Sequence, residues 1–60
     1  MIRINEETPE AQLREIKAGD LVTDTFSKTG LVESIDIKDD GLYMIYTFTL
    51  VTGRMIVVKR

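Results

Sequence analysis

Two β-rich runs flank a short polar turn in the segment Gly19-Asp-Leu-Val-Thr-Asp-Thr-Phe-Ser-Lys-Thr-Gly-Leu-Val-Glu-Ser-Ile-Asp36. From Asp20 to Phe26 the side chains alternate between two faces, and this alternation predicts Val22 and Phe26 on the same one. Ser27-Lys-Thr-Gly30 supplies the turn, because its glycine can adopt a positive φ. The segment therefore predicts a β-hairpin, and the pattern of its second strand continues to Lys38.

The C-terminal part of the chain continues the β pattern. Lys38-Asp-Asp-Gly41 is a second turn signal, of the Asp-Gly type that favours tight hairpins. Thr52-Gly53 marks a third turn, and Met55 to Val58 predicts a final strand that is apolar on both faces. The strand between these two turns is the longest, and one face of it is the expected main core. That face consists of Leu42, Met44, Tyr46, Phe48 and Leu50.

The N-terminal part combines a strand signal with a weak helix signal. Ile2-Arg-Ile4 alternates apolar and polar side chains and predicts a short strand at a sheet edge. Thr8 precedes the single proline of the chain and is a natural helix N-cap. A short helix from Pro9 to about Lys17, or an irregular loop over the same residues, is expected to pack Leu13 and Ile16 against the sheet.

Length and composition limit the chemistry that the chain can perform. It has 60 residues, with 43% hydrophobic and 30% charged side chains, which is typical of one small folded domain. Neither cysteine nor histidine is present, so disulfides, the usual zinc ligand sets and most nucleophile–base pairs are excluded. Asp39-Asp40 precedes a glycine and is interpreted as a turn rather than as a calcium or acid–base site. We therefore expect no enzyme activity, no cofactor and no metal.

The order of the β signals predicts a small curled sheet. Four runs joined by short turns, with a short strand before them, indicate a five-stranded antiparallel meander. A sheet of this size must curl to bury a core, and closure removes exposed edges that invite aggregation. We predict a mainly β, five-stranded antiparallel barrel that spans residues 1–60 as a single domain, with a short N-terminal helical turn or loop.

One motif resembles a known family. Lys17-Ala-Gly-Asp-Leu-Val22 and Lys28-Thr-Gly-Leu-Val-Glu-Ser-Ile35 form the pattern Gly-Asp-x-Val…Gly-x-Val-x-x-Ile, which covers about a third of the chain. This pattern is similar to that of the KOW and related SH3-like modules. The resemblance implies an SH3-like barrel and an attachment to transcription or ribosomal machinery through RNA or protein contacts.

The charge distribution favours a protein partner over a nucleic acid. The net charge is −2, from ten acidic and eight basic side chains, and the basic residues are interleaved with acidic ones. Binding to phosphate backbones normally uses a clustered Lys/Arg surface, which this sequence does not indicate. A KOW-like nucleic-acid module remains the alternative. Its contacts would be Lys28, Lys38, Arg54, Lys59 and Arg60.

The candidate interaction surface is the second face of the longest strand, opposite the predicted core. This face is unusually apolar for one left in water, and it consists of Tyr43, Ile45, Thr47, Thr49 and Val51. In one interpretation the N-terminal segment, through Leu13 and Ile16, or a second sheet layer covers it. In the other it stays exposed and binds a partner through Tyr43, Ile45 and Val51.

Three functional hypotheses follow from these observations. The favoured one is a protein-interaction adaptor or inhibitor, of the kind that small viral and mobile-element proteins often are. The second is the KOW-like nucleic-acid module, and the third is a self-assembling subunit that pairs Ile2–Ile4 with Met55–Val58. The chain starts without a signal-like apolar run, and Leu42–Val51 has about half the length that a membrane helix needs. A cytoplasmic protein without a membrane partner is therefore expected.

Overall fold

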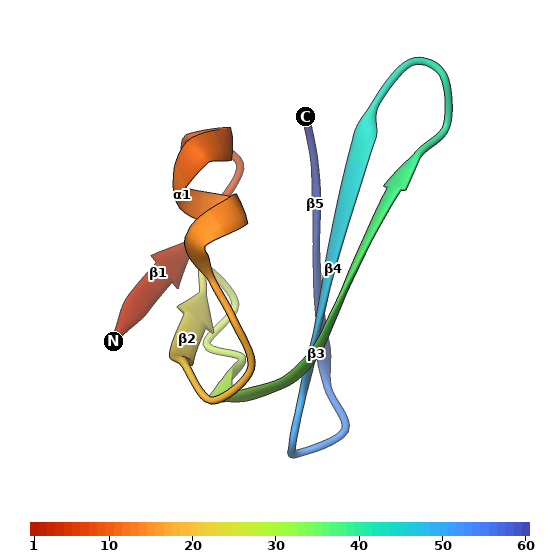
Figure 1. Cartoon of the computed structure of the whole chain (residues 1–60). Coiled ribbons are helices and arrows are strands. Elements are labelled where there is room, and N and C mark those ends of the chain that lie inside the picture. Colours follow the sequence, from red (N-terminus) through yellow and green to blue (C-terminus); the bar gives the residue numbers. More distant parts are fainter.

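The computed structural model describes residues 1–60 and contains five β-strands and one short α-helix (Figure 1). The chain starts with β1, continues through α1 and ends with four strands that follow one another directly. In order, the elements are β1 (Ile2–Ile4), α1 (Glu10–Glu15), β2 (Leu21–Asp24), β3 (Thr29–Asp39), β4 (Met44–Leu50) and β5 (Met55–Lys59). The protein is thus mainly β, as predicted.

The strands form one sheet in the order β1-β2-β3-β4-β5. From β2 to β5 all neighbours are antiparallel, but β1 pairs in parallel with β2 and aligns Ile2 with Val22. The prediction of an all-antiparallel meander is therefore wrong at its first strand. The reason is the crossover through α1, because a chain that returns before starting the next strand makes a parallel pair.

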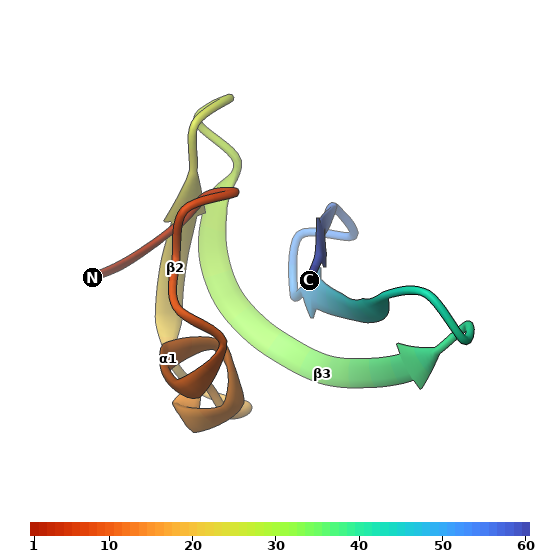
Figure 2. The same cartoon turned by 90° about the horizontal axis from the view of Figure 1, so that it is seen from above.

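The sheet is strongly bent, but it is not closed into the predicted barrel. Seen from above, β3 arches from the side of β1, β2 and α1 toward β4 and β5 (Figure 2). A register shift between Val32 and Ser34 lies within β3, where a bulge increases local bend and twist. β1 bonds only to β2, and β5 bonds only to β4. A closed barrel would require β1 and β5 to pair with each other. β1 has only three residues, and the chain after it turns into the loop that leads to α1.

The core is a cluster of ten buried side chains, to which α1 and the residue after it contribute Leu13 and Ile16. Burial of these two side chains is as predicted. The remaining members come from all five strands. They are Ile4, Val22, Val32, Tyr46, Phe48, Leu50, Ile56 and Val58.

Leu42, which was predicted for the core, and Phe26, which was predicted to share a face with Val22, both lie outside this cluster. Leu42 is 85% exposed in the loop between β3 and β4, and Phe26 is 81% exposed in the turn between β2 and β3. Phe26 lies beyond the end of β2, and Leu42 lies before the start of β4. Outside a strand the chain no longer places side chains on alternate faces, so the alternation pattern does not apply to these two residues. The rest of the predicted face of β4 is correct, since Tyr46 and Phe48 are fully buried.

The turns match the glycine signals in two of three cases. Gly41 and Gly53 have φ of 95° and 92°, as expected for the turns after β3 and β4. Between β2 and β3, however, Ser27 takes the positive φ of 65°, and Gly30 already belongs to β3. The Asp24 carboxylate fixes this turn, because its Oδ1 accepts the backbone N–H of Lys28 at 2.8 Å.

The helix is shorter than predicted, and its cap differs. α1 ends at Glu15, and Pro9 occupies the N-cap position without a side-chain capping bond. The predicted cap, Thr8, is buried, and its hydroxyl instead accepts the backbone N–H of Asn5 at 2.9 Å. This hydroxyl stabilises the loop before the helix. No helix in the structure has the length and apolar character needed to span a membrane.

Candidate protein-interaction face

Tyr43 and Ile45 lie on the outer face, defined here as the side of β3, β4 and β5 that points away from the core. Strand alternation places Ile45 opposite Met44 and Tyr46, which pack in or against the core. Tyr43 directly precedes β4, and its ring lies near Lys59, the residue paired with Ile45. Tyr43 is 49% exposed, and Ile45 is partly exposed. The predicted assignment of these two residues to a second, non-core face is confirmed.

The N-terminal segment does not cover the outer face. Leu13 and Ile16 belong to the buried core cluster, together with Tyr46 and Phe48. Arg14 of the same helix is on the core side of β4 as well, because its Nε donates to the hydroxyl of the buried Tyr46 at 3.1 Å. The interpretation that this segment shields Tyr43 is therefore wrong, because α1 is needed to complete the core.

Two residues of β5 extend the apolar surface that the sequence indicated on β4. The sheet register places Val57 beside Thr47 and Met55 beside Thr49. Val57 is 56% exposed and Met55 is 53% exposed. We call the set Tyr43, Ile45, Met55 and Val57 the outer patch. The sequence signal for Met55 and Val57 was the prediction that β5 is apolar on both faces. That prediction did not identify the two residues as partner contacts.

Val51, the third predicted contact, lies away from the outer patch. It belongs to the turn after β4, and its backbone N–H donates to the Leu31 carbonyl at 2.9 Å. Leu31 pairs with Leu21 across β2 and β3, and all three side chains are exposed. The structure thus separates Val51 from Tyr43 by the length of β4 and groups it with two leucines.

Two of the predicted basic residues flank the outer patch. Lys38 and Lys59 lie on either side of Ile45 in one row across β3, β4 and β5. The Lys59 Nζ lies 5.9 Å from the centroid of the Tyr43 ring, within the range of a cation–π contact. Arg54 is exposed in the turn before β5, near the opposite end of that strand.

The other two basic residues make contacts within the protein. The Lys28 Nζ donates to the carbonyl of Met55 at 3.2 Å. The guanidinium of Arg60 donates to the carbonyls of Asn5 and Thr8 at 3.0 Å each through Nη2 and Nε. Arg60 therefore joins the C-terminal end of the chain to the loop between β1 and α1. The five basic residues do not form one continuous surface.

Asp39 and Asp40 stabilise the turn between β3 and β4, in agreement with their predicted role. The Asp40 Oδ1 accepts the backbone N–H groups of Leu42 and Tyr43 at 2.9 and 2.7 Å. These bonds, that of Tyr43 most strongly, lower the pKa of Asp40. The structure contains no cluster of three or more acidic, cysteine or histidine side chains placed to hold a metal ion.

A polar cluster that the sequence did not indicate joins α1 to the sheet. The hydroxyl of the buried Tyr46 donates to Glu10 Oε2 at 2.5 Å, and Arg14 Nη2 binds the same oxygen at 3.2 Å. The bond from Tyr46, followed by that from Arg14, lowers the pKa of Glu10. Because Tyr46 is far from α1 in sequence, no local pattern could have revealed this contact.

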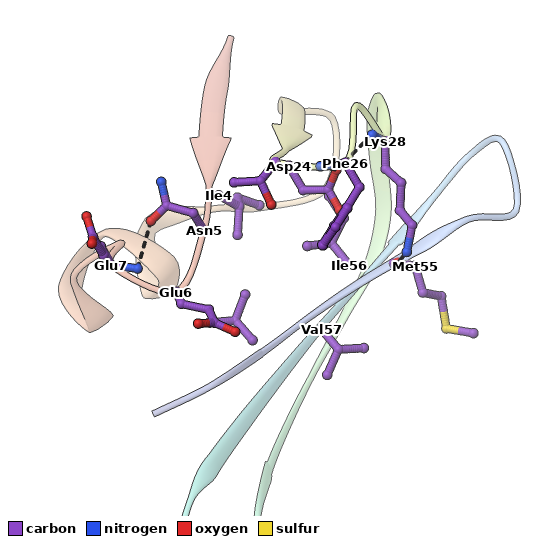
Figure 3. A pocket seen from close by; sticks show the side chains of 12 residues that line it. Ile4, Asn5, Glu6, Glu7, Asp24, Phe26, Lys28, Met55, Ile56 and Val57 are labelled. Carbon is purple, nitrogen blue, oxygen red and sulfur yellow. Dashed lines mark hydrogen bonds between the residues drawn. The ribbon is translucent and has the colours of Figure 1, made fainter.

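A groove of about 660 Å³ runs beside β5 (Figure 3). Three segments line it: residues 4–7 from the end of β1 onward, residues 24–28 from the end of β2 through the following turn, and β5 itself. The lining includes the buried side chains of Ile4, Ile56 and Val58 and the exposed ring of Phe26. The groove therefore has apolar residues at its base, although it is open to water.

The chain was compared with protein-family models, with curated proteins and with solved structures, and none of them matches it. The function is therefore inferred from the two surfaces described above, the outer patch and the groove beside β5.

Proposed function

We propose that the protein is a non-enzymatic protein-binding module, an adaptor or inhibitor, that contacts its partner through the outer patch on β4 and β5. As part of the same proposal, the module works in the cytoplasm, a compartment that its lack of cysteine fits. The KOW resemblance of Gly19–Asp36 is consistent with a recognition module, and it stays a prediction.

One observation carries the proposal: an apolar face remains uncovered although the chain has a helix available. Met55 and Val57 are each about half exposed on β5, and Tyr43, which directly precedes β4, is exposed to a similar extent. Neighbouring exposed apolar side chains mark interaction sites more often than isolated ones do. Tyrosine is also enriched at protein interfaces, where its ring offers a large contact area and a polar tip.

The charges around the outer patch indicate the kind of protein surface that it fits. Lys38 and Lys59 lie at the Ile45 end of the patch, and Asp36 is aligned with Thr47 at its middle. A partner with an apolar centre and an acidic group opposite the two lysines would match this arrangement. Apolar contacts would supply most of the affinity, so binding should persist at high salt.

The test is affinity capture from an extract of the source cells at low and high salt, with the double variant Tyr43→Ala, Ile45→Ala beside the wild type. We expect one protein to be captured at both salt concentrations and to be lost with the variant. The matched control is Leu21→Ala, Leu31→Ala, which removes exposed apolar side chains at the other end of the sheet. This control should capture the protein normally.

Recovery of nucleic acid would contradict the proposal. In that case capture should decrease steeply with salt, because phosphate binding releases counterions, and it should be lost in Lys38→Ala, Lys59→Ala. A protein captured equally well by the Tyr43→Ala, Ile45→Ala variant would also contradict it, since binding would then use another surface.

A further inference from the structure

The outward edge of β5 carries main-chain groups that no strand of the protein uses. Met44 and Arg60 exchange both of their backbone hydrogen bonds, at 2.7 and 2.8 Å. In an antiparallel pair such bonded positions alternate with non-bonded ones, so Met55, Val57 and Lys59 turn their N–H and C=O groups away from β4. No strand lies on that side, because β5 is the last strand of the sheet.

Part of this edge is already protected, and part is open. The Lys28 Nζ donates a hydrogen bond to the Met55 carbonyl, and the Arg60 Nη1 donates one to the Lys59 carbonyl at 2.9 Å. The groups of Val57, between them, have no such partner. Exposed strand edges of this type accept an added strand through their main-chain groups, with side-chain pockets providing selectivity.

The groove beside this edge has walls that suit one extended chain. Ile4, Ile56 and Val58 form an apolar base, and the Phe26 ring stands exposed on the β2–β3 turn (Figure 3). Met55 and Val57 line the groove and also belong to the outer patch, so the two surfaces meet along β5. An extended segment places alternate side chains on opposite faces, so every second residue of a bound segment would meet the apolar base.

The charge of the groove indicates what the segment must carry. Glu6, Glu7 and Asp24 line it, against the single base Lys28. The only ion pair of the protein joins Arg14 to Glu10, so Glu6 and Glu7 have no cationic partner within the chain. A lysine or arginine of the ligand would therefore find two uncompensated carboxylates beside the edge of β5.

We infer that the groove binds an extended segment of a partner protein, which adds to the free edge of β5 as a sixth strand and contains apolar residues and at least one basic residue. This site uses the main-chain edge of β5 rather than its outer face; it shares Met55 and Val57 with the outer patch, and it does not depend on the outer patch having a partner. Bound in this way, the segment hydrogen-bonds to Val57 and replaces Lys28 at the Met55 carbonyl. Lys28→Met should accordingly strengthen binding, because it removes both a competitor and a like charge.

The test selects ligands for the purified full chain from a library of random linear peptides and then studies the strongest binder as a synthetic peptide. The binder should be rich in β-branched and basic residues, and it should slow hydrogen exchange at the amides of Val57 and Lys59. N-methylation of the peptide nitrogens that face β5 should weaken binding about tenfold, since it removes main-chain hydrogen bonds. Failure to select a peptide, or protection confined to other residues, would overturn the proposal.

Matched variants of the protein distinguish strand addition through main-chain hydrogen bonds from binding through side chains alone. Val57→Pro removes the N–H group that points away from β4, and proline is tolerated at such positions of an edge strand. Val57→Thr keeps both the amide and the branched side-chain shape. The first variant should weaken peptide binding about tenfold and the second should not. If Val57→Pro bound the peptide as tightly as the wild type does, the proposal would be overturned. The N-methylated peptide tests the same main-chain hydrogen bonds with the wild-type protein.

Three further outcomes complete the experiment. Glu6→Gln, Glu7→Gln should weaken binding of the basic peptide, and an unchanged affinity would overturn the assigned ligand charge. Tyr43→Ala, Ile45→Ala should bind the peptide normally, and a loss would place the peptide on the outer patch instead. Protection of the Val57 amide in a dimer without peptide would show that a second copy fills the edge, which would also overturn the inference.

Discussion

At the scale of single residues, Tyr46 stabilises the fold in two ways, through its ring and through its hydroxyl. Its ring is fully buried in the core, while its hydroxyl joins Glu10 and Arg14 of the helix. Tyrosine is suited to this position because it combines a large apolar body with a polar tip. The helix has less than two turns of hydrogen-bonded backbone, so its stability depends on such tertiary contacts.

Tyr46→Phe tests this contact directly. The variant keeps the ring but leaves Glu10 and Arg14 without the hydroxyl, and we expect it to lower the free energy of unfolding by about 1 kcal/mol. Chemical denaturation measures this difference. The control is Tyr43→Phe, whose hydroxyl lies on the exposed outer face and should have little effect. Equal loss in both variants would contradict the role assigned to Tyr46.

Two carboxylates with lowered pKa values predict that folding is sensitive to acid. The Tyr46 hydroxyl first, and then Arg14, holds the pKa of Glu10 below its ordinary value of 4.5, and the backbone N–H groups of Tyr43 and Leu42 lower the pKa of Asp40 from 3.8. A group with a lowered folded-state pKa stabilises the fold above its unfolded value. That stabilisation is lost as the pH falls below 4.5 toward the folded value.

We therefore expect the unfolding free energy to decrease steadily as the pH falls below the ordinary pKa of Glu10. Denaturant titrations of wild type and Glu10→Gln at a series of pH values provide the measurement. The variant should be less stable at neutral pH and should show a shallower decrease in acid. An identical pH profile for the two proteins would exclude Glu10 as a source of the dependence.

At the scale of elements, the loop between β1 and α1 is held by the last residue of the chain. Arg60 donates to the carbonyls of Asn5 and Thr8, which places the C-terminal end of β5 against the start of the helix. Carbonyls that accept a charged donor form stronger hydrogen bonds than neutral pairs do. This contact fixes one end of the groove beside β5.

Arg60→Met should loosen that end of the molecule while keeping most of the apolar stem. We expect faster hydrogen exchange at the amides of Thr8 and Leu13, which bond within this segment, and little change in β3 and β4. Arg54→Met is the matched control, since Arg54 is exposed in a turn and its side chain makes no hydrogen bond. Similar exchange rates in Arg60→Met and the wild type would show that the contact does not hold the loop.

The same scale shows which elements a sequence can predict. Alternation identified the buried face of β4, because a strand with one buried face must repeat every second residue. β5 was predicted from an apolar run, and its buried face, Ile56 and Val58, is known only from the structure. Alternation was wrong at Phe26, which follows the end of β2, and at Leu42, which precedes the start of β4. The helix bounds were also wrong, since the Thr8 hydroxyl binds in the loop rather than at the cap.

For the whole molecule, the relation between distant segments could not be predicted. The parallel pairing of β1 and the open edge of β5 depend on where α1 packs, and no local pattern contains that information. For the candidate site, alternation predicted the outer placement of Tyr43 and Ile45, but their union with Met55 and Val57 required the register of β4 and β5. The groove unites three segments far apart in the chain, so it is visible only in the folded protein.

The central claim is that the outer patch binds a protein, and site-specific photo-crosslinking from position 43 tests it most directly. A benzophenone amino acid at Tyr43 keeps an aromatic group on the exposed face and reacts only with what touches it. In the source cells we expect a covalent adduct with one protein, absent when the same group replaces Leu21 at the other end of the sheet. An adduct with nucleic acid, or equal adducts from both positions, would contradict the account.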